Sequence, residues 1–182
     1  SVRIVGSGLI GTSIGLGLVQ HGVQVQMVDS DSKAQSLAKD LVGGVNIAIP
    51  DLVVLAMPTS QLTKVINEEN QLNPQSTFID VGSVKNEVVL QVERISGLSR
   101  RFLPTHPMAG REIGGASSAR ADLFQGRSWI LTPSAEVDPA SRELVLELIE
   151  HLGATPIELS ALDHDRAVAR VSHLPQIASS LI

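Results

Sequence analysis

A glycine-rich stretch near the start of the sequence, VRIVGSGLIGTSIGLGL, has the residue types and spacing to bind a phosphate group. Gly6, Gly8 and Gly11 form the pattern G-x-G-x-x-G between a strand-like run and a helix-like segment. In this pattern the first glycine permits a tight turn, the second lets the backbone approach a pyrophosphate, and the third allows close packing of helix on strand. The helix N-terminus adds N–H donors and a positive dipole end. The pattern therefore predicts a dinucleotide-binding loop, with a glycine-rich turn that binds nothing as the alternative.

An acidic residue at the end of the next strand-like run supports the dinucleotide interpretation. Asp29 lies where a carboxylate would accept hydrogen bonds from the hydroxyls of the adenosine ribose. A carboxylate there would also repel a 2′-phosphate, so we expect NAD rather than NADP. Ser30 and Lys33 lie close by and would soften that preference.

Polar side chains also follow three later strand-like runs. The loop PTSQ follows the third run and would cover the cofactor. Ser83 and Lys85 follow the fourth run in GSVK, and His106, Arg111 and Glu112 follow the fifth in THPMAGREIGG. Because ligands bind at the carboxyl ends of strands in open α/β sheets, we expect these side chains at one rim of the sheet.

His106 is the strongest candidate for a catalytic group. Hydride transfer from an alcohol carbon requires loss of the hydroxyl proton, and a neutral imidazole accepts a proton well near pH 7. The alternative is a histidine that only satisfies structural hydrogen bonds. Ser83 would orient the substrate hydroxyl or the imidazole, or else serve a turn or helix cap. Asp80 is expected to be structural, and Lys85 either pairs with a phosphate or carboxylate or is solvated.

The segment LDHDRAVARVSHLPQ holds two further histidines. The Asp-His-Asp string around His164 resembles a metal-binding cluster at first sight. However, adjacent residues of a helix point in different directions, so we expect no metal site. Asp163 is the expected helix N-cap, and Ser172 and His173 would face the crevice.

Short apolar runs alternate with helix-like segments along the chain, which predicts an α/β fold with a doubly wound, Rossmann-type parallel sheet whose strands are buried on both faces. The expected strands are Val2–Val5, Val23–Val28, Leu52–Met57, Thr77–Val81, Arg101–Leu103, Ser128–Leu131 and Thr155–Leu159. The expected helices are Leu9–Val19, Gln61–Glu69, Lys85–Ile95 and Ala140–Leu152.

The chain divides into two expected parts. Residues 1–160 form the nucleotide-binding domain, and residues 161–182 form the first helix of an α-helical domain. The stretch DLVGGVNIAIPDLVV leaves little room for a further strand before Leu52, so we expect a compressed connection or missing residues there.

Composition excludes several classes of function. The net charge of −5 and the scarcity of aromatic residues (2%) argue against nucleic-acid binding, which needs basic patches or stacking platforms. No apolar run is long enough to cross a membrane, and no signal peptide precedes the first strand. The absence of cysteine excludes disulfides and thiolate chemistry. We therefore expect a soluble cytoplasmic protein that acts on a small molecule.

Six motifs in order along the chain give a family resemblance: GSGLIGTSIGLGL, DLVVLAMP, IDVGSVK, THPMAGREIGG, LFQGRSWILTP and DHDRAVARVSHLP. Together they resemble the prephenate and arogenate dehydrogenases of tyrosine biosynthesis. The combination of DVGSVK, HPMAG and SHLP is far more specific than the glycine pattern alone.

The resemblance implies a reaction and roles for individual residues. NAD would accept a hydride from C4 of the prephenate ring, CO₂ would leave, and 4-hydroxyphenylpyruvate would form. His106 would deprotonate the C4 hydroxyl, Ser83 would assist it near the nicotinamide, Glu112 would order the site, and His173 would line the substrate pocket. The residues expected to bind the cofactor are Gly6, Gly8, Leu9, Ile10, Gly11, Asp29, Pro58 and Ser83. The resemblance also implies a homodimer formed through the C-terminal helical domain.

Several points stay open from sequence. Gln176 stands where many family members carry a second histidine after SHLP, so the choice between prephenate and arogenate is undecided. The arginine that binds a substrate carboxylate is expected beyond Ile182. Two alternative functions are a dehydrogenase of the 3-hydroxyacid type, which would lack HPMAG, and a non-catalytic NAD-sensing module, which would not need His106.

Overall fold

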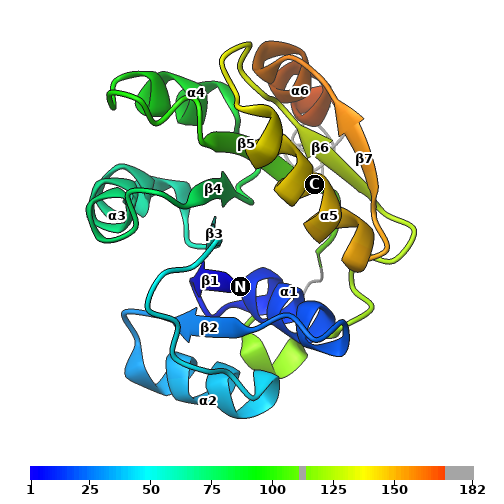
Figure 1. Cartoon of the computed structure of the whole chain (residues 1–182). Helices are drawn as coiled ribbons and strands as arrows, with labels where there is room; N and C mark the ends of the chain where they lie inside the picture. The colour runs from blue at the N-terminus through cyan, green and yellow to red at the C-terminus, as the bar shows by residue number, and fades with distance from the viewer. Residues whose placement is uncertain (111–113, 171–182) are drawn as a thin grey trace.

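The chain forms a seven-stranded sheet with helices on both faces (Figure 1). The computed structural model describes residues 1–110 and 114–170. The strands are β1 (Val2–Val5), β2 (Val25–Val28), β3 (Leu52–Leu55), β4 (Thr77–Asp80), β5 (Phe102–Pro107), β6 (Ser128–Leu131) and β7 (Thr155–Glu158). The helices are α1 (Leu9–Gln20), α2 (Ser32–Val42), α3 (Thr59–Leu72), α4 (Asn86–Glu93), α5 (Pro139–His151) and α6 (Ala161–Val168), with a short 3-10 helix η1 (Ala116–Ser118).

The sheet is mostly but not wholly parallel. Its strand order is β2-β1-β3-β4-β5-β6-β7, and the first five strands of this order pair in parallel. β6 runs antiparallel to β5, and β7 runs parallel to β6. The predicted α/β fold with a doubly wound, Rossmann-type sheet is confirmed, although β6 and β7 run opposite to the other five strands. A parallel partner needs a long crossover that returns the chain to the starting edge, but the described part of the connection from β5 to β6 holds only η1.

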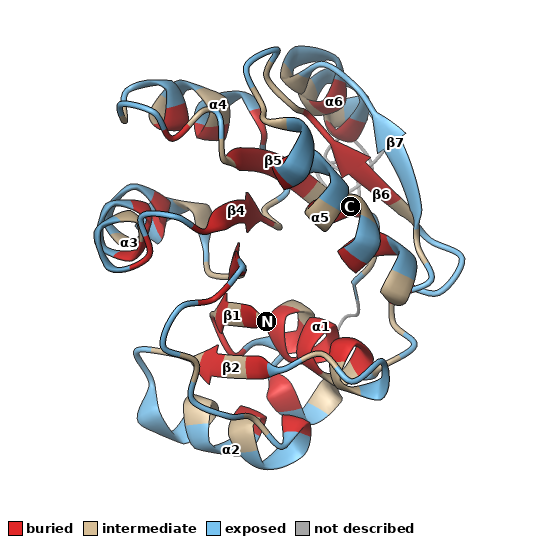
Figure 2. Cartoon of the chain, viewed as in Figure 1, coloured by how far each residue is buried: buried red, intermediate tan, exposed pale blue. Residues whose placement is uncertain are grey.

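Each face of the sheet has its own hydrophobic core. Side chains from α1, α2 and α5 pack on one face, and those from α3 and α4 pack on the other. Figure 1 shows this division, with α3 and α4 on one side of the strands and α1 and α5 on the other. The central strands β3 and β4 are buried at every position, as continuous apolar sequence predicts, whereas β7 is exposed throughout (Figure 2). The expectation that all strands are buried on both faces was wrong for β7.

The compressed segment between α2 and β3 contains no strand. Gly43 follows the last residue of α2 and caps the helix, and its φ of 69° is a left-handed conformation typical of that position. The chain then passes along β2, where the Val45 N–H donates to the carbonyl of Val25, and enters β3 at Leu52. β3 pairs with β1, so β2 stays at the edge of the sheet.

Two element boundaries differ from expectation near the candidate site. β5 extends to Pro107, beyond the predicted end at Leu103, because its last residues pair with β6. His106 therefore lies on a strand instead of in the loop that follows it. The helix expected over residues 161–182 is observed as α6, which packs against α4, and the part beyond residue 170 lies outside the described residues. In the two described ranges no helix is both long and apolar enough to cross a membrane.

Candidate active site

The glycine loop between β1 and α1 is shaped by two contacts that only glycine permits. Gly6 has a φ of 110°, and a Cβ atom there would lie 2.4 Å from the carbonyl oxygen of Ala56. A Cβ atom on Gly11 would lie 2.1 Å from the carbonyl oxygen of Gly6. Both distances are well below van der Waals contact, so these glycines let the loop and α1 lie directly against the end of β3.

Gly8 has a different environment from the other two glycines. Its φ of −78° suits any residue, and nothing lies within 4 Å of a Cβ atom placed on it. Thr12 donates the first hydrogen bond of α1 to the carbonyl of Gly8, so the N–H groups of Leu9, Ile10 and Gly11 have no acceptor inside the helix. The open space at Gly8 and these N–H groups fit a pyrophosphate.

A cavity of about 300 Å³ lies beside this loop at the carboxyl ends of β1, β2 and β3. Asp29 lines it and organises its wall: Oδ2 accepts a hydrogen bond of 2.6 Å from the Ser7 N–H, and Oδ1 accepts one of 2.9 Å from the Asp31 N–H. The residues that line this cavity are Val5, Gly6, Gly8, Asp29, Ser30, Ala56, Met57, Pro58, Gln61 and Val65. Pro58 and Asp29 thus lie at the same cavity as the glycine loop.

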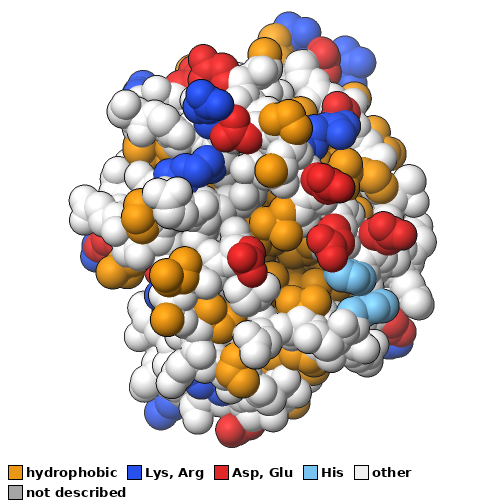
Figure 3. All heavy atoms as spheres, in the orientation of Figure 1, with side chains coloured by type: hydrophobic (Ala, Val, Ile, Leu, Met, Phe, Trp, Pro, Cys, Tyr) orange, Lys and Arg blue, Asp and Glu red, His pale blue; other side chains and the backbone are white. Residues whose placement is uncertain are grey.

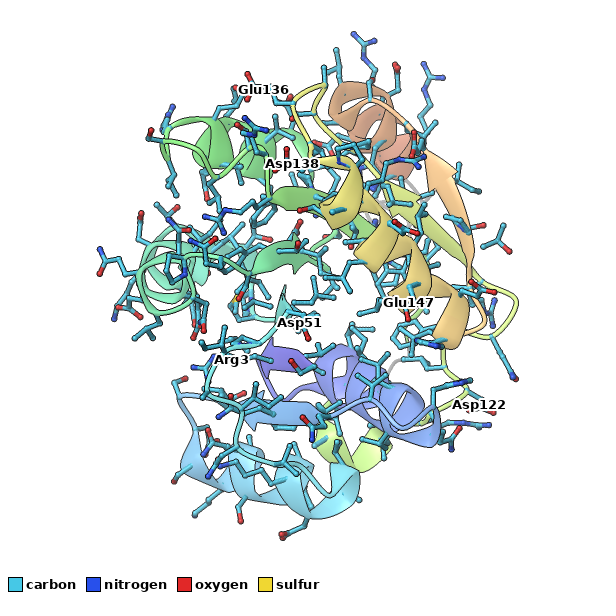
Figure 4. All side chains as sticks on the ribbon, viewed as in Figure 1. Arg3, Asp51, Asp122, Glu136, Asp138 and Glu147 are labelled. Carbon is cyan, nitrogen blue, oxygen red and sulfur yellow. The ribbon has the colours of Figure 1, made fainter. Side chains whose placement is uncertain are left out.

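A second cavity, of about 230 Å³, lies at the opposite, amino ends of β1 and β3 and is bordered by α1 and α5. Asp51 and Glu147 line it, and Figures 3 and 4 show acidic side chains around an apolar groove on this face. Two carboxylates there would repel a pyrophosphate, whereas the cavity at the glycine loop offers the N–H groups at the start of α1.

Lys85 is not solvated, which corrects one of the sequence interpretations. Its side chain is fully buried and its ammonium donates to the carboxylate of Asp80 and, at 2.7 Å, to the carbonyl of Thr105. Asp80 also accepts from the N–H groups of Gly82 and Thr105. Burial lowers the pKa of Lys85 and raises that of Asp80, and the ion pair opposes both shifts. The pair fixes the backbone next to His106, so Lys85 is not available to bind a substrate carboxylate.

His106 is connected to a second histidine. Its Nδ1 atom lies 2.9 Å from Nε2 of His164, and the two rings meet edge to face at 77°. Nδ1 of His164 in turn lies 2.7 Å from Oδ1 of Asp165. The Asp165 carboxylate accepts hydrogen bonds from the backbone N–H groups of Lys85 at 2.8 Å and Asn86 at 2.9 Å. β5, α6 and the start of α4 therefore meet in one hydrogen-bonded chain.

The electrostatic setting keeps His106 neutral. Burial, together with the nearby His164 and Lys85, lowers the pKa of the His106 imidazole from 6.5 to about 4. Burial alone would raise the pKa of Asp165, but the N–H donors of Asn86 and Lys85 and the contact with His164 outweigh it and hold that pKa below its ordinary value. At neutral pH the site therefore holds an uncharged imidazole and an ionised carboxylate.

The remaining predicted site residues divide into three groups. Ser83 is exposed at the end of β4, at the same edge of the sheet as His106. Glu112 and His173 lie outside the described residues. Asp163 is not the N-cap of α6, because Ser160 fills that position and its hydroxyl accepts from the Asp163 N–H at 3.1 Å.

Sequence reasoning missed the partners of His106. The Asp-His-Asp string suggests only a metal ligand at His164 and indicates no separate role for Asp165. Throughout residues 1–110 and 114–170, no group of three or more His, Asp or Glu side chains could hold a metal ion. The acidic residues that flank His164 were the available signal, since a carboxylate beside a histidine can orient its ring.

The fold and the glycine loop define a dinucleotide-binding α/β domain of the Rossmann type. The family model for the nucleotide-binding domain of prephenate dehydrogenase matches residues 5–158, and the chain belongs to this family.

Individual relatives agree with this assignment. A probable prephenate dehydrogenase, NovF, from Streptomyces niveus is 35% identical over 182 residues, which cover 98% of this chain and 50% of the relative. The Aquifex aeolicus prephenate dehydrogenase, solved with hydroxyphenyl propionate and NAD⁺, superposes with a TM-score of 0.88 at 30% identity and covers 99% of this chain and 67% of that one. The arogenate dehydrogenase of Synechocystis superposes with a TM-score of 0.86 at 27% identity. The match covers 96% of this chain and 64% of that one. The chain spans about half the length of the curated relatives it matches.

Proposed function

We propose that the protein that carries this domain catalyses the oxidative decarboxylation of prephenate to 4-hydroxyphenylpyruvate with NAD as the hydride acceptor. The observation that carries this proposal is a neutral imidazole, His106, at the same edge of the sheet as the nucleotide cavity. Relatives named prephenate dehydrogenase support the choice of substrate. Arogenate is the alternative substrate, because a relative of similar structure is an arogenate dehydrogenase.

The glycine loop and Asp29 would hold the dinucleotide. The pyrophosphate fits the free N–H groups at the start of α1, and Gly8 leaves space for it. Each Asp29 oxygen already accepts one backbone N–H and retains lone pairs for the ribose hydroxyls. The Asp29 charge favours NAD over NADP, whose 2′-phosphate it would repel. When bound, NAD would supply the hydride acceptor.

His106 would accept the proton in this reaction. The C4 hydroxyl of the substrate ring gives its proton to the free ring nitrogen of His106 as the hydride leaves C4, and loss of CO₂ from C1 restores the aromatic ring. Aromatisation supplies most of the driving force, so positioning and proton removal are what the protein adds. Ser83 is proposed to assist His106 near the nicotinamide, Glu112 to order the site, and His173 to line the substrate pocket.

The family resemblance also supports proposals about the domain that follows and about the oligomeric state. We propose that residues 161–182 begin a helical domain that completes the substrate site and mediates a homodimer. We also propose that the enzyme acts in the cytoplasm, where it would take a small-molecule substrate.

Steady-state kinetics of the full-length protein test the function. With prephenate or arogenate, NAD⁺ reduction is expected, and His106→Asn should lower kcat by about 10²- to 10⁴-fold, the usual contribution of general base catalysis, while NAD⁺ affinity is unchanged. His21→Asn, at an exposed histidine at the end of α1, is the matched control. If the wild-type protein bound NAD⁺ but oxidised neither compound, the substrate assignment would be wrong and the nucleotide site would stand.

A further inference from the structure

We infer that His164 and Asp165 are positioning residues that set the ring tautomer of His106, so that its Nε2 atom carries the lone pair that receives the substrate proton. This inference rests on the proposed function of His106 as proton acceptor. It concerns two adjacent residues of α6 that touch His106 and the start of α4.

The direction of the hydrogen bonds follows from Asp165. An ionised carboxylate only accepts, so Nδ1 of His164, at 2.7 Å, must donate to it. In a neutral imidazole the other nitrogen is then an acceptor, so Nε2 of His164 accepts at 2.9 Å from the Nδ1–H of His106. With its proton on Nδ1, the neutral His106 ring has an unprotonated Nε2.

The reverse direction is disfavoured. For Nε2 of His164 to donate to His106, the His164 ring would need a second proton or would have to give up its hydrogen bond to Asp165. His164 is only 1% exposed, so a hydrogen bond to Asp165 that is given up could not be replaced by one to water. A proton on Asp165 is opposed by the two backbone N–H groups that face its oxygens.

Asp165 is itself held in place at both oxygens. Oδ1 accepts from the Lys85 N–H at 2.8 Å and Oδ2 from the Asn86 N–H at 2.9 Å, at the N-terminus of α4. The positive end of the α4 dipole further favours the ionised form. The carboxylate is thus held in position in its ionised form. Through the buried ring of His164 it determines which nitrogen of His106 carries the proton.

Asp165→Asn in the full-length protein tests the inference. An asparagine presents an NH₂ group in place of one oxygen, so His164 can take the opposite tautomer and donate to His106. We expect kcat with prephenate to fall about tenfold or more, because a general base in the wrong tautomer cannot accept the proton, while KM and NAD⁺ affinity change little. The control is Asp163→Asn, which removes the same charge from an exposed position of the same helix and should leave kcat unchanged.

Nuclear magnetic resonance of the ring nitrogens provides a readout that needs no variant and no substrate. Long-range proton–nitrogen correlation distinguishes protonated from unprotonated ring nitrogens, and wild-type His106 is expected to show protonated Nδ1 and unprotonated Nε2. A protonated Nε2 in the neutral wild-type ring, or wild-type kcat in folded Asp165→Asn, would overturn the inference. If the wild-type protein oxidised neither prephenate nor arogenate, the proposed function would fail, and the tautomer measurement would still decide the inference.

Discussion

Asp29 at the end of β2 and Ser7 in the glycine loop are joined by a short hydrogen bond, with 2.6 Å between the carboxylate Oδ2 and the backbone nitrogen. The other carboxylate oxygen accepts from the Asp31 N–H at 2.9 Å. The residue expected to bind the ribose therefore also holds the loop expected to bind the pyrophosphate. A single carboxylate would couple the two halves of the nucleotide site.

Asp29→Asn should weaken NAD⁺ binding and reduce discrimination against NADP⁺. The NH₂ group of asparagine must face one of two backbone donors, which leaves an N–H group without an acceptor. The variant also offers the ribose hydroxyls a neutral amide in place of a charged acceptor, and loss of one charge-assisted hydrogen bond to the ribose corresponds to about a tenfold rise in the Kd for NAD⁺. Calorimetric titration with both cofactors measures the change, with Asp40→Asn at an exposed position of α2 as the control. An unchanged ratio of the two Kd values would contradict the role of Asp29.

Gly8 and Gly11 should respond differently to the same substitution. Gly11→Ala places a Cβ atom 2.1 Å from a backbone oxygen, so the free energy of unfolding should fall by about 1–3 kcal/mol or more. Gly8→Ala has open space around its Cβ and should change that free energy by less than about 0.5 kcal/mol, yet obstruct the pyrophosphate and weaken NAD⁺ binding. Denaturant unfolding and NAD⁺ titration separate the two effects. Full NAD⁺ affinity in Gly8→Ala would show that the pyrophosphate lies elsewhere.

Lys85→Met should destabilise the domain strongly. The substitution leaves the Asp80 carboxylate buried without its cation, which costs about 3–5 kcal/mol of unfolding free energy. The double variant Lys85→Met/Asp80→Asn should lose less than the sum of the two single losses, because it leaves no unpaired charge. Lys64→Met, at a lysine that is 81% exposed on α3, serves as the control in denaturant unfolding. Additive losses would show that the two side chains act independently.

His106 should make stability depend on pH in a mildly acidic window. Its pKa is about 4 in the folded chain against 6.5 in the unfolded chain, so between these values the unfolded state binds more protons. Stability therefore falls as pH drops from about 6.5 towards 4. His106→Asn removes this contribution, and the difference in unfolding free energy between wild type and variant should change across that window. A constant difference from pH 7 to pH 4 would mean that the imidazole is protonated equally in both states.

The geometry of the glycine loop could be predicted from sequence because its demands are local. Gly6 and Gly11 are required by contacts between adjacent elements, and Asp29 ends the strand that follows directly. The strand-end rule also led to His106, which depends on the parallel pairing of β4 and β5. Gly6, Gly11 and Asp29 are placed by rules that involve only one strand and its connection.

The contacts of His106 could not be predicted to the same depth because they are long-range. His106 and His164 are 58 residues apart, and their contact requires α6 to pack against α4. The burial of Lys85 depends on the carbonyl of Thr105, which belongs to another strand. The reversal of β6 was missed for a similar reason, since strand direction is set by the length and path of a connection and not by the residues of the strand.

The edge strand β7 has a consequence for how the domain behaves at high concentration. The N–H groups of Thr155 and Leu159 donate towards β6, so the alternate residue Pro156 occupies a position whose N–H would face outward. Proline has no N–H, and Glu158 nearby pairs with Arg142 on the surface. A strand from another molecule that paired with β7 would lack the hydrogen bond from position 156 and would have to displace the ion pair of Glu158 and Arg142. This short, exposed edge therefore disfavours aggregation by strand pairing.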